Sequence, residues 1–284
     1  MSLASAFVHT ILEQPDADAP RLVFADWLEE RGDPLAELIR VQCDLAQAKP
    51  SDPRSQPLRL RERELLEDHD DKWLGPIREM GLSGRFHRGL LEVAITGAQR
   101  LFECAEQLFS LPWVLHIELR DPAIDSDSLT RLAGSPYFAR LQRLDLSRSY
   151  VGNSGLLALS RSPYGCSLTQ LNLKHIQVSS DGLRAITESL NLSRLTELRL
   201  FGNGIGATGA RALALCPQLR RLRILDLSYN HVGTVGGEYL AESQFLNHLR
   251  TLYVRGNNIG PRGKKALLRR YGPRVHFGTS EPLP

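Results

Sequence analysis

A hydrophobic pattern recurs along the chain from about residue 114 onward. Apolar residues occupy the first, fourth and sixth positions of a short motif, as in Leu195, Leu198 and Leu200. The alternation at the end of the motif predicts a strand, because successive strand side chains point to opposite faces. The sixth positions follow one another at a constant interval: Leu119, Leu146, Leu173, Leu200, Leu227 and Val254. A fixed period of this length predicts a solenoid whose units bury their apolar faces against one another.

Each copy continues into a turn and a short helix. The turn after the third complete motif is Asn203-Gly-Ile-Gly206, and the helix that follows carries its leucine and alanine residues on one face. Loops that often contain proline return the chain to the next strand. Stacked units of this kind predict an α/β fold with one parallel sheet and a layer of helices.

These residues resemble the leucine-rich repeat of the ribonuclease-inhibitor type, with the motif Leu-x-x-Leu-x-Leu-x-x-Asn-x-Ile-Gly-x-x-Gly, over about residues 85–278. The resemblance implies a horseshoe with the parallel sheet on the concave face and the helices on the convex face. Ala123, Ser149 and Ile176 replace the motif's asparagine, so we expect differently bonded turns in these copies. We assign residues 81–284 to this domain, with a last helix and a short closing strand as its C-terminal cap.

The N-terminal residues have no such period and predict three short helices, around 4–14, 18–32 and 33–48. Asp18 and Pro20 are typical of a helix start, with an acidic cap and a proline in the first turn. The string from Pro20 to Asp33, followed by Glu37-Leu-Ile-Arg-Val-Gln42, resembles the bacterial repeat-companion domain, a family named for preceding repeat arrays. The resemblance implies a small all-α domain at residues 1–48 and assigns it no activity.

Two details of this region are open to interpretation. Asp26, Glu29, Glu30 and Arg31 could form a binding patch, but we favour an ordinary helix with Leu22, Trp27 and Leu28 in a small core. Residues 49–80 are interpreted as a linker, 49–56, and a charged capping helix, 58–73, whose Trp73 and Leu74 are expected to pack on the first repeat.

Composition narrows the class of protein. Leucine accounts for 50 of 284 residues, as a leucine-rich solenoid requires. The net charge of +3 is the sum of −7 over residues 1–80 and +10 over residues 81–284, which indicates two modules. No signal peptide or membrane-spanning stretch is recognisable. The four cysteines lack metal-ligand or disulfide-framework spacing, so we expect a protein that binds no metal and resides in the reducing cytoplasm. We also expect the chain to be a monomer.

Enzymatic motifs are weak. Gly204-Ile-Gly-Ala-Thr-Gly209 matches a dinucleotide-binding pattern, but Gly206 and Gly209 occupy positions where other repeats also have glycine. The sequence has no His-x-x-x-His pair, no nucleophile elbow and no Walker loop. We therefore expect no enzyme and no cofactor.

The exposed face of the sheet is the best candidate for a binding site. Phe201 and Tyr253 are expected to flank Asp226 there, with arginines nearby, and this composition is typical of protein-binding hot spots. Single exposed aromatic residues are also common on any surface, so both interpretations stay open. Nucleic acid is disfavoured, because the basic runs around Arg220 and Lys264 lack interleaved aromatic residues. The candidate contacts are Arg120, Lys174, Arg199, Phe201, Asp226, Tyr253 and Arg255.

The favoured function is therefore a non-enzymatic protein-protein interaction module. The alternatives are a regulator of a GTPase, by analogy with leucine-rich activators of this repeat type, and a structural spacer without a specific partner.

Overall fold

A computed structural model of the chain describes residues 3–14, 17–48, 52–111, 114–164 and 167–278. The chain divides into two compact units. The first unit comprises Met1–Ile95 and Leu101–Ile117, and the second comprises Thr96–Arg100 and Glu118–Pro284. Each unit is considered separately below.

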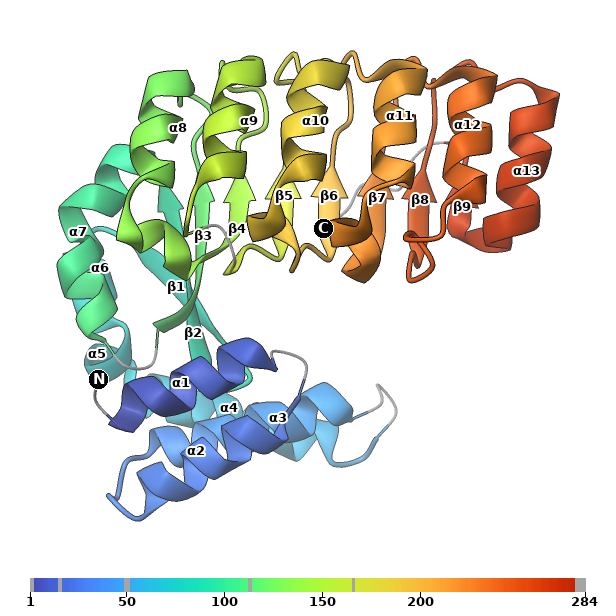
Figure 1. The fold of residues 1–284 in the computed structure, drawn as a ribbon. Coiled ribbons are helices and arrows are strands. Elements are labelled where there is room, and N and C mark those ends of the chain that lie inside the picture. The colour runs from blue at the N-terminus through green and yellow to red at the C-terminus, as the bar shows by residue number, and fades with distance from the viewer. Residues whose placement is uncertain (1–2, 15–16, 49–51, 112–113, 165–166, 279–284) are drawn as a thin grey trace. The chain divides into compact units, whose positions relative to one another are not determined.

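The first unit is mainly helical at its start, as the sequence predicts (Figure 1). Its elements, three of which (β2, α7 and β3) extend into the second unit, are α1 (Leu3–Glu13), α2 (Ala19–Glu29), α3 (Leu35–Gln47), α4 (Ser55–Asp68), α5 (Asp70–Trp73), α6 (Gly75–Glu79), β1 (Ser83–His87), β2 (Leu90–Thr96), α7 (Ala98–Ser110) and β3 (Val114–Arg120). The three N-terminal helices are confirmed. The single helix expected over 58–73 is wrong, because non-helical backbone at His69 separates α4 from α5.

An apolar cluster from α1 to α5 and the start of β2 forms the core of this unit. Trp73 is 1 % exposed within it, and its ring centroid lies 5.4 Å from that of Phe86 in β1. The tryptophan thus packs on the hairpin at the start of region 81–284, which the sequence assigns to the repeats, and it shares a core with the N-terminal helices. Leu28 is buried and Trp27 half-buried, as expected, but Leu22 is exposed, so its assignment to the core is wrong.

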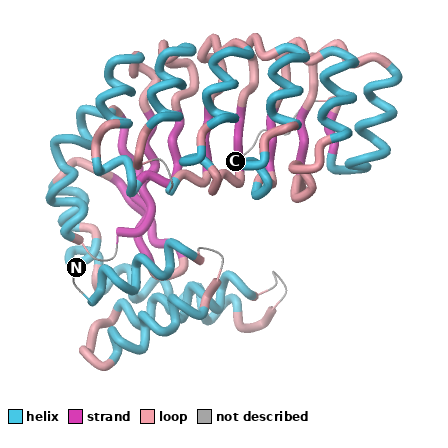
Figure 2. The backbone as a smooth tube through the Cα atoms, in the orientation of Figure 1, coloured by secondary structure: helices cyan, strands magenta, loops and turns pink. Residues whose placement is uncertain are grey.

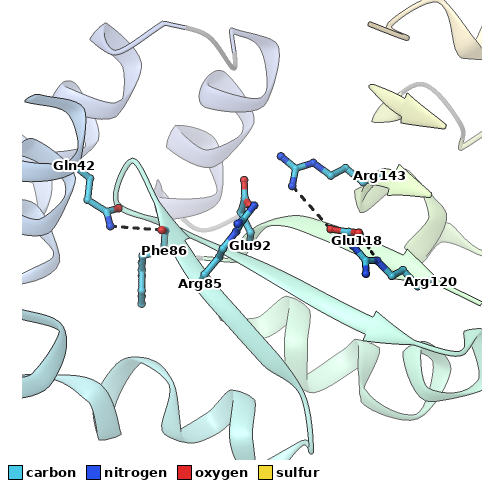
Figure 3. Close-up of polar contacts among 7 residues, drawn as sticks. All are labelled: Gln42, Arg85, Phe86, Glu92, Glu118, Arg120 and Arg143. Carbon is cyan, nitrogen blue, oxygen red and sulfur yellow. Dashed lines mark hydrogen bonds and ion pairs between the residues drawn. The ribbon is translucent and has the colours of Figure 1, made fainter. Parts of the chain in front are cut away.

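The β1–β2 hairpin is antiparallel and its turn contacts α3. Arg88 and Gly89 have φ values of +50° and +79°, as expected in a two-residue turn. The backbone N–H of Gly89 donates to Oε1 of Gln42 at 2.6 Å, and Nε2 of Gln42 lies 3.5 Å from the Phe86 carbonyl oxygen (Figure 3). Asp18 does not cap α2 as predicted, because its carboxylate instead pairs with Arg88 and accepts from Gln47.

The second unit contains the predicted repeats from residue 118 onward, whereas residues 81–95 and 101–117 of the range assigned to them fall in the first unit. Strands β4 to β9 are paired in parallel and in sequence order, and helices α8 to α13 form a separate layer beside them (Figures 1 and 2). Leu144, Leu171, Leu198, Leu225 and Leu252 are each at most 1 % exposed. The elements are α8 (Ser126–Ala133), β4 (Leu141–Asp145), α9 (Gly152–Arg161), β5 (Gln170–Asn172), α10 (Ser180–Glu188), β6 (Glu197–Arg199), α11 (Gly206–Ala214), β7 (Ile224–Asp226), α12 (Gly233–Glu242), β8 (Thr251–Tyr253), α13 (Pro261–Tyr271) and β9 (Val275–His276).

Buried asparagines hold the turns of the later repeats. The side-chain amide of Asn203 donates to the carbonyl oxygens of Leu173 and Leu200, at 2.8 and 2.9 Å. Two repeats later, Asn257 makes the equivalent bonds to the carbonyl oxygens of Leu227 and Val254. The asparagine of the motif therefore bridges neighbouring repeats, since one of its two carbonyl partners lies in the preceding copy.

A second ladder, which the sequence analysis did not identify, joins the ends of the helices. The hydroxyl of Ser189 donates to the Ser160 carbonyl oxygen at 2.7 Å, and the thiol of Cys216 lies 3.1 Å from the Thr187 carbonyl oxygen. Ser162 and Ser243 make the same contact, again to a residue 29 positions earlier. The signal for this ladder is a serine or cysteine once in every repeat: Ser135, Ser162, Ser189, Cys216 and Ser243.

The C-terminal cap has the expected helix and closing strand. The hydroxyl of Tyr271, in α13, donates to the Leu240 carbonyl oxygen at 2.8 Å, and the tyrosine is 2 % exposed. Arg274 donates to the Leu249 carbonyl oxygen at 2.7 Å. These bonds tie the cap to carbonyl groups of the preceding repeat.

Candidate functional site

The helices cover one face of the sheet in the second unit, and we call the other face the strand face. The register between strands fixes which residues are neighbours on it. Arg199 in β6 pairs with Asn172 on one side and Asp226 on the other, and Asp226 pairs with Tyr253. These four residues therefore form one continuous row across the sheet.

A turn with left-handed backbone follows each strand at its carboxyl end. Positive φ recurs at the same position of successive repeats, at Arg148, His175, Gly202, Tyr229 and Gly256, with values between +53° and +69°. A Cβ atom on Gly202 would lie 2.4 Å from the His175 ring, and one on Gly256 would lie 2.5 Å from the Tyr229 ring. Each ring thus covers the glycine of the next repeat, and only glycine leaves room for it.

Aromatic side chains come together at this edge. The ring centroid of Phe201 lies 5.0 Å from that of His175 and 5.0 Å from that of Tyr229. The guanidinium carbon of Arg255 lies 5.5 Å from the Tyr229 ring centroid, within the range of a cation–π contact. We call His175, Phe201, Tyr229 and Arg255 the carboxyl-edge cluster. Tyr229 and His175 are exposed, so the cluster faces solvent although its members contact one another.

The charge at this edge is positive. Arg148 is exposed and Lys174 and Arg255 are half-buried. The neighbouring carboxylates of Asp145 and Asp226 each accept a hydrogen bond from the backbone N–H two residues later, at 2.9 and 3.0 Å. These carboxylates stabilise the start of the turns, whereas the cationic side chains are presented at the surface.

The structure separates the residues that the sequence grouped around Asp226. Asp226 is 3 % exposed and therefore is not available as an exposed contact. Tyr253 stacks with His276 of the closing strand, with centroids 5.1 Å apart, whereas Phe201 contacts Tyr229. Arg199 pairs with Glu197 on its own strand. The two aromatic residues that were expected to act together lie in different ring contacts.

Arg120 is exposed near the start of the second unit. Its Nε donates to the Glu118 carboxylate at 2.7 Å, and this hydrogen bond raises the pKa of the Arg120 guanidinium. Arg143 lies 4.0 Å from the same carboxylate (Figure 3). Arg120 is thus part of a local charge pair rather than of the carboxyl-edge cluster.

His175 and Tyr229 were missed because candidates were sought only on the exposed face of the predicted sheet. Both residues lie three positions past the last strand residue, in the turn. The signal that could have found them is the alternation of ring and glycine at one position of successive repeats, along His175, Gly202, Tyr229 and Gly256.

The glycines of the dinucleotide-like pattern have structural roles. Gly206 has φ of +63°, close to the values of Gly152 and Gly233 at the same place in their repeats. A Cβ atom on Gly209 would lie 2.3 Å from Ile205, so close packing between helix and turn requires this glycine. Within the part of the chain that the structure describes, no group of His, Cys, Asp or Glu is arranged to hold a metal ion.

The strand face, the helix layer and the repeated turns define the second unit as a leucine-rich-repeat solenoid. The Leucine Rich repeat family matches three segments of the chain, residues 191–214, 218–241 and 245–268. No curated protein matches the chain. Leucine-rich repeats generally mediate protein–protein interaction and are typically not enzymes. Among the described residues, no helix has the length and apolar character needed to cross a membrane.

Proposed function

We propose that the chain is a non-enzymatic interaction module whose repeat unit binds a partner protein through the carboxyl-edge cluster and the adjoining strand face. The observation that carries the proposal is the line of contacting rings from His175 through Phe201 to Tyr229, with Arg255 over the last ring. Tryptophan, tyrosine and arginine often carry most of the binding energy of protein interfaces, and aromatic side chains bury a large area while they lose little conformational freedom. Rings that already touch in the free protein lose still less.

The partner should present an acidic segment that also carries an apolar or aromatic side chain. Lys174, Arg148 and Arg255 supply positive charge beside the rings, while the nearby aspartates are bonded to backbone N–H groups. Charge complementarity of this kind increases the rate of association and selects between partners. Arg199 and Tyr253 extend the surface along the strand face, and Arg120 lies nearer its other end.

The proposal includes four further expectations. The repeats are of the ribonuclease-inhibitor type, the N-terminal helices form a bacterial repeat-companion domain, the chain is a monomer, and it acts in a reducing cytoplasm. The last expectation is supported by Cys43, Cys104 and Cys216, which are buried free thiols.

Affinity purification from the cell of origin tests the proposed function. The bait is the full chain, compared with a double variant, Phe201→Ala with Tyr229→Ala. The matched control is Tyr150→Ala, which removes a tyrosine that is 79 % exposed and lies outside the cluster. Proteins captured by the wild type are then purified and their affinities measured directly.

We expect the double variant to bind the purified partner at least tenfold more weakly, and the Tyr150 variant to bind it normally. Equal binding by all three proteins would exclude the cluster as the binding site. Capture of a GTPase whose hydrolysis rate rises in the presence of the chain would favour the regulator, and reproducible absence of any partner would favour the spacer.

A further inference from the structure

We infer a second binding site, in the helical unit: a cavity of about 270 Å³ that takes an apolar group carrying a carboxylate. The cavity is bordered by α1, α2, the α2–α3 turn, the start of α3, and α5. It lies entirely within the first unit and is independent of the carboxyl-edge cluster. Its walls include Trp27 and Arg31, from the segment that the sequence analysis interpreted as an ordinary helix.

The floor of the cavity is apolar and already packed. Phe24, Leu28 and Leu35 line it and are 1 %, 6 % and 2 % exposed. The indole of Trp27 forms part of the wall, with its ring centroid 5.9 Å from that of Phe24 and 5.5 Å from that of Phe7. Because these rings hold one another, a ligand would enter a preformed surface and would not need to order it.

Trp27 also has an unused hydrogen-bond donor. Its indole N–H is buried and makes no hydrogen bond to any described residue. A buried donor without an acceptor destabilises the protein, but this N–H has almost no accessible area and is therefore shielded from a ligand in the cavity. The polar part of the ligand is therefore argued from the charged side chains that line the cavity.

Two cations lie at the cavity. The guanidinium carbon of Arg31 lies 3.9 Å from the Trp27 ring centroid, and Nζ of Lys72 lies 3.3 Å from the Asp33 carboxylate. The side chains of Arg31 and Lys72 are 48 % and 52 % exposed. Glu30, 3.6 Å from Arg31, is 76 % exposed, so solvent screens this pair.

The lining therefore has two cations and one carboxylate, that of Asp33. The same Asp33 oxygen also accepts the backbone N–H of Leu35 at 3.1 Å, which ties it to the start of α3. A net positive lining above an apolar floor is complementary to a carboxylate attached to an aliphatic or aromatic group. The volume is below that of most drug-sized sites and suits one side chain.

Two sources present this chemistry: a peptide that ends in leucine or phenylalanine, and a free small acid. The probes are N-acetyl-leucine and N-acetyl-phenylalanine, their C-terminal amides, and an eight-residue peptide ending in phenylalanine. Binding to the full ¹⁵N-labelled chain is followed through the indole N–H signals, and the Trp27 signal is assigned from Trp27→Phe.

We expect the acids to shift the Trp27 indole signal saturably and the amides to bind at least tenfold more weakly. Arg31→Gln and Lys72→Gln should each weaken binding of the acids several-fold, and Ala4→Met, which places a longer side chain in the cavity, should abolish it. The matched control is Arg40→Gln, because Arg40 pairs with Asp26 and Glu29 outside the cavity. Thermal melts confirm that each variant is folded.

The relative affinities of the probes distinguish the two sources of the ligand. Tighter binding of the peptide than of the acetylated amino acids assigns the site to peptide termini, and equal or weaker binding assigns it to small acids. Equal affinity for acids and amides, no saturable shift at Trp27, or undiminished binding to folded Ala4→Met would each overturn the proposal.

Discussion

The side-chain oxygen of Asn203 accepts a hydrogen bond from the backbone N–H of Ile176, one repeat earlier, at 3.2 Å. It accepts a second from the N–H of Val178, at 3.1 Å. Ile176 occupies the position where the motif has asparagine, and its side chain is buried as an apolar residue. The turn of that repeat is thus bonded by the asparagine of the next one, in the same way as the turn at Asn230 is bonded by Asn257.

Replacing Asn203 should therefore destabilise two repeats at once. Asn203→Ala leaves two buried N–H groups and the Leu173 carbonyl without their side-chain partner, while the Leu200 carbonyl keeps Asn230, and we expect a loss of ~3–5 kcal/mol in the free energy of unfolding. Urea denaturation measures it. The control, Gln244→Ala, changes an exposed polar residue in a loop of the same unit and should stay within ~0.5 kcal/mol of the wild type. Similar values for the two variants would contradict the bridging role.

The hydrogen bonds that serine and cysteine side chains make between the ends of neighbouring helices give a second prediction. Ser189→Ala removes the donor to the Ser160 carbonyl and should cost ~1–3 kcal/mol, because that carbonyl is buried. Cys216→Ser puts a stronger donor at the equivalent position and should be neutral or slightly stabilising. Thermal unfolding of both variants tests this. A large loss for Cys216→Ser would mean that packing of the thiol, rather than the hydrogen bond, matters there.

The contact between Gly256 and Tyr229 can be tested by adding one methyl group. Gly256→Ala combines a φ of +68° with a clash against the Tyr229 ring, whereas Gly206→Ala has a φ of +63° and nothing within 4 Å. Both substitutions should lower the free energy of unfolding by ~1 kcal/mol, because a residue with a Cβ atom is strained in left-handed backbone. Only the first should also displace the ring, which we expect to see as shifted Tyr229 and Phe201 ring signals in NMR spectra. Unshifted ring signals in Gly256→Ala would show that the ring does not rest on this glycine.

The hairpin turn of the first unit should tolerate no side chain at Gly89. A Cβ atom there would lie 2.3 Å from the backbone Cα of Ile39, which cannot rotate away, and φ is +79°. We expect Gly89→Ala to destabilise the first unit by more than ~3 kcal/mol. Gly32→Ala, with φ of +65° and no neighbour within 4 Å, is the control and should cost ~1 kcal/mol. Hydrogen exchange of α3 amides distinguishes the two.

Alkaline pH should weaken the first unit through Cys43. Burial raises the pKa of its thiol from 9.0 to about 11. The unfolded chain therefore loses this proton first as the pH rises, and stability falls between about pH 9 and pH 11. We expect a loss of ~1–2 kcal/mol attributable to this residue. Urea denaturation at about pH 8 and pH 10.5 measures it.

Cys216 and Tyr271 also have raised pKa values through burial, so they contribute to the same trend. The comparison with Cys43→Ala isolates Cys43, because that variant keeps the other two groups. If the variant loses as much stability as the wild type over this range, the thiol is not responsible.

The repeat array could be predicted from the sequence because its signal is local and repeated. Leu144, Leu171 and Leu198 recur in register, and each strand depends on its own few residues. The carboxyl-edge cluster could not be predicted in the same way, because the contact between Phe201 and Tyr229 depends on the turn geometry at Gly202 and Gly256. The exposed position of Asp226 was wrong for a related reason, since its burial depends on neighbours from two other strands.

In the helical unit, too, the sequence predicts the local elements but not the contacts between distant segments. Its helices follow from proline, glycine and charge positions, but the break at His69 and the place of Trp73 depend on packing against the hairpin. The cavity beside Trp27 is likewise a product of three segments that are distant in the sequence.

The side-chain hydrogen bonds that join neighbouring repeats through these serine and asparagine residues all connect a repeat to the copy that precedes it. Ser189 and Asn203 each bond to carbonyl groups of the preceding copy, and the same holds for Ser243 and Asn257. A ribosome releases the chain from its N-terminus, so every copy emerges before the residues that complete its hydrogen bonding. Part of the hydrogen bonding of each repeat thus depends on residues that are synthesised after it, and the bonding of the array can be completed only from its N-terminal side towards the cap.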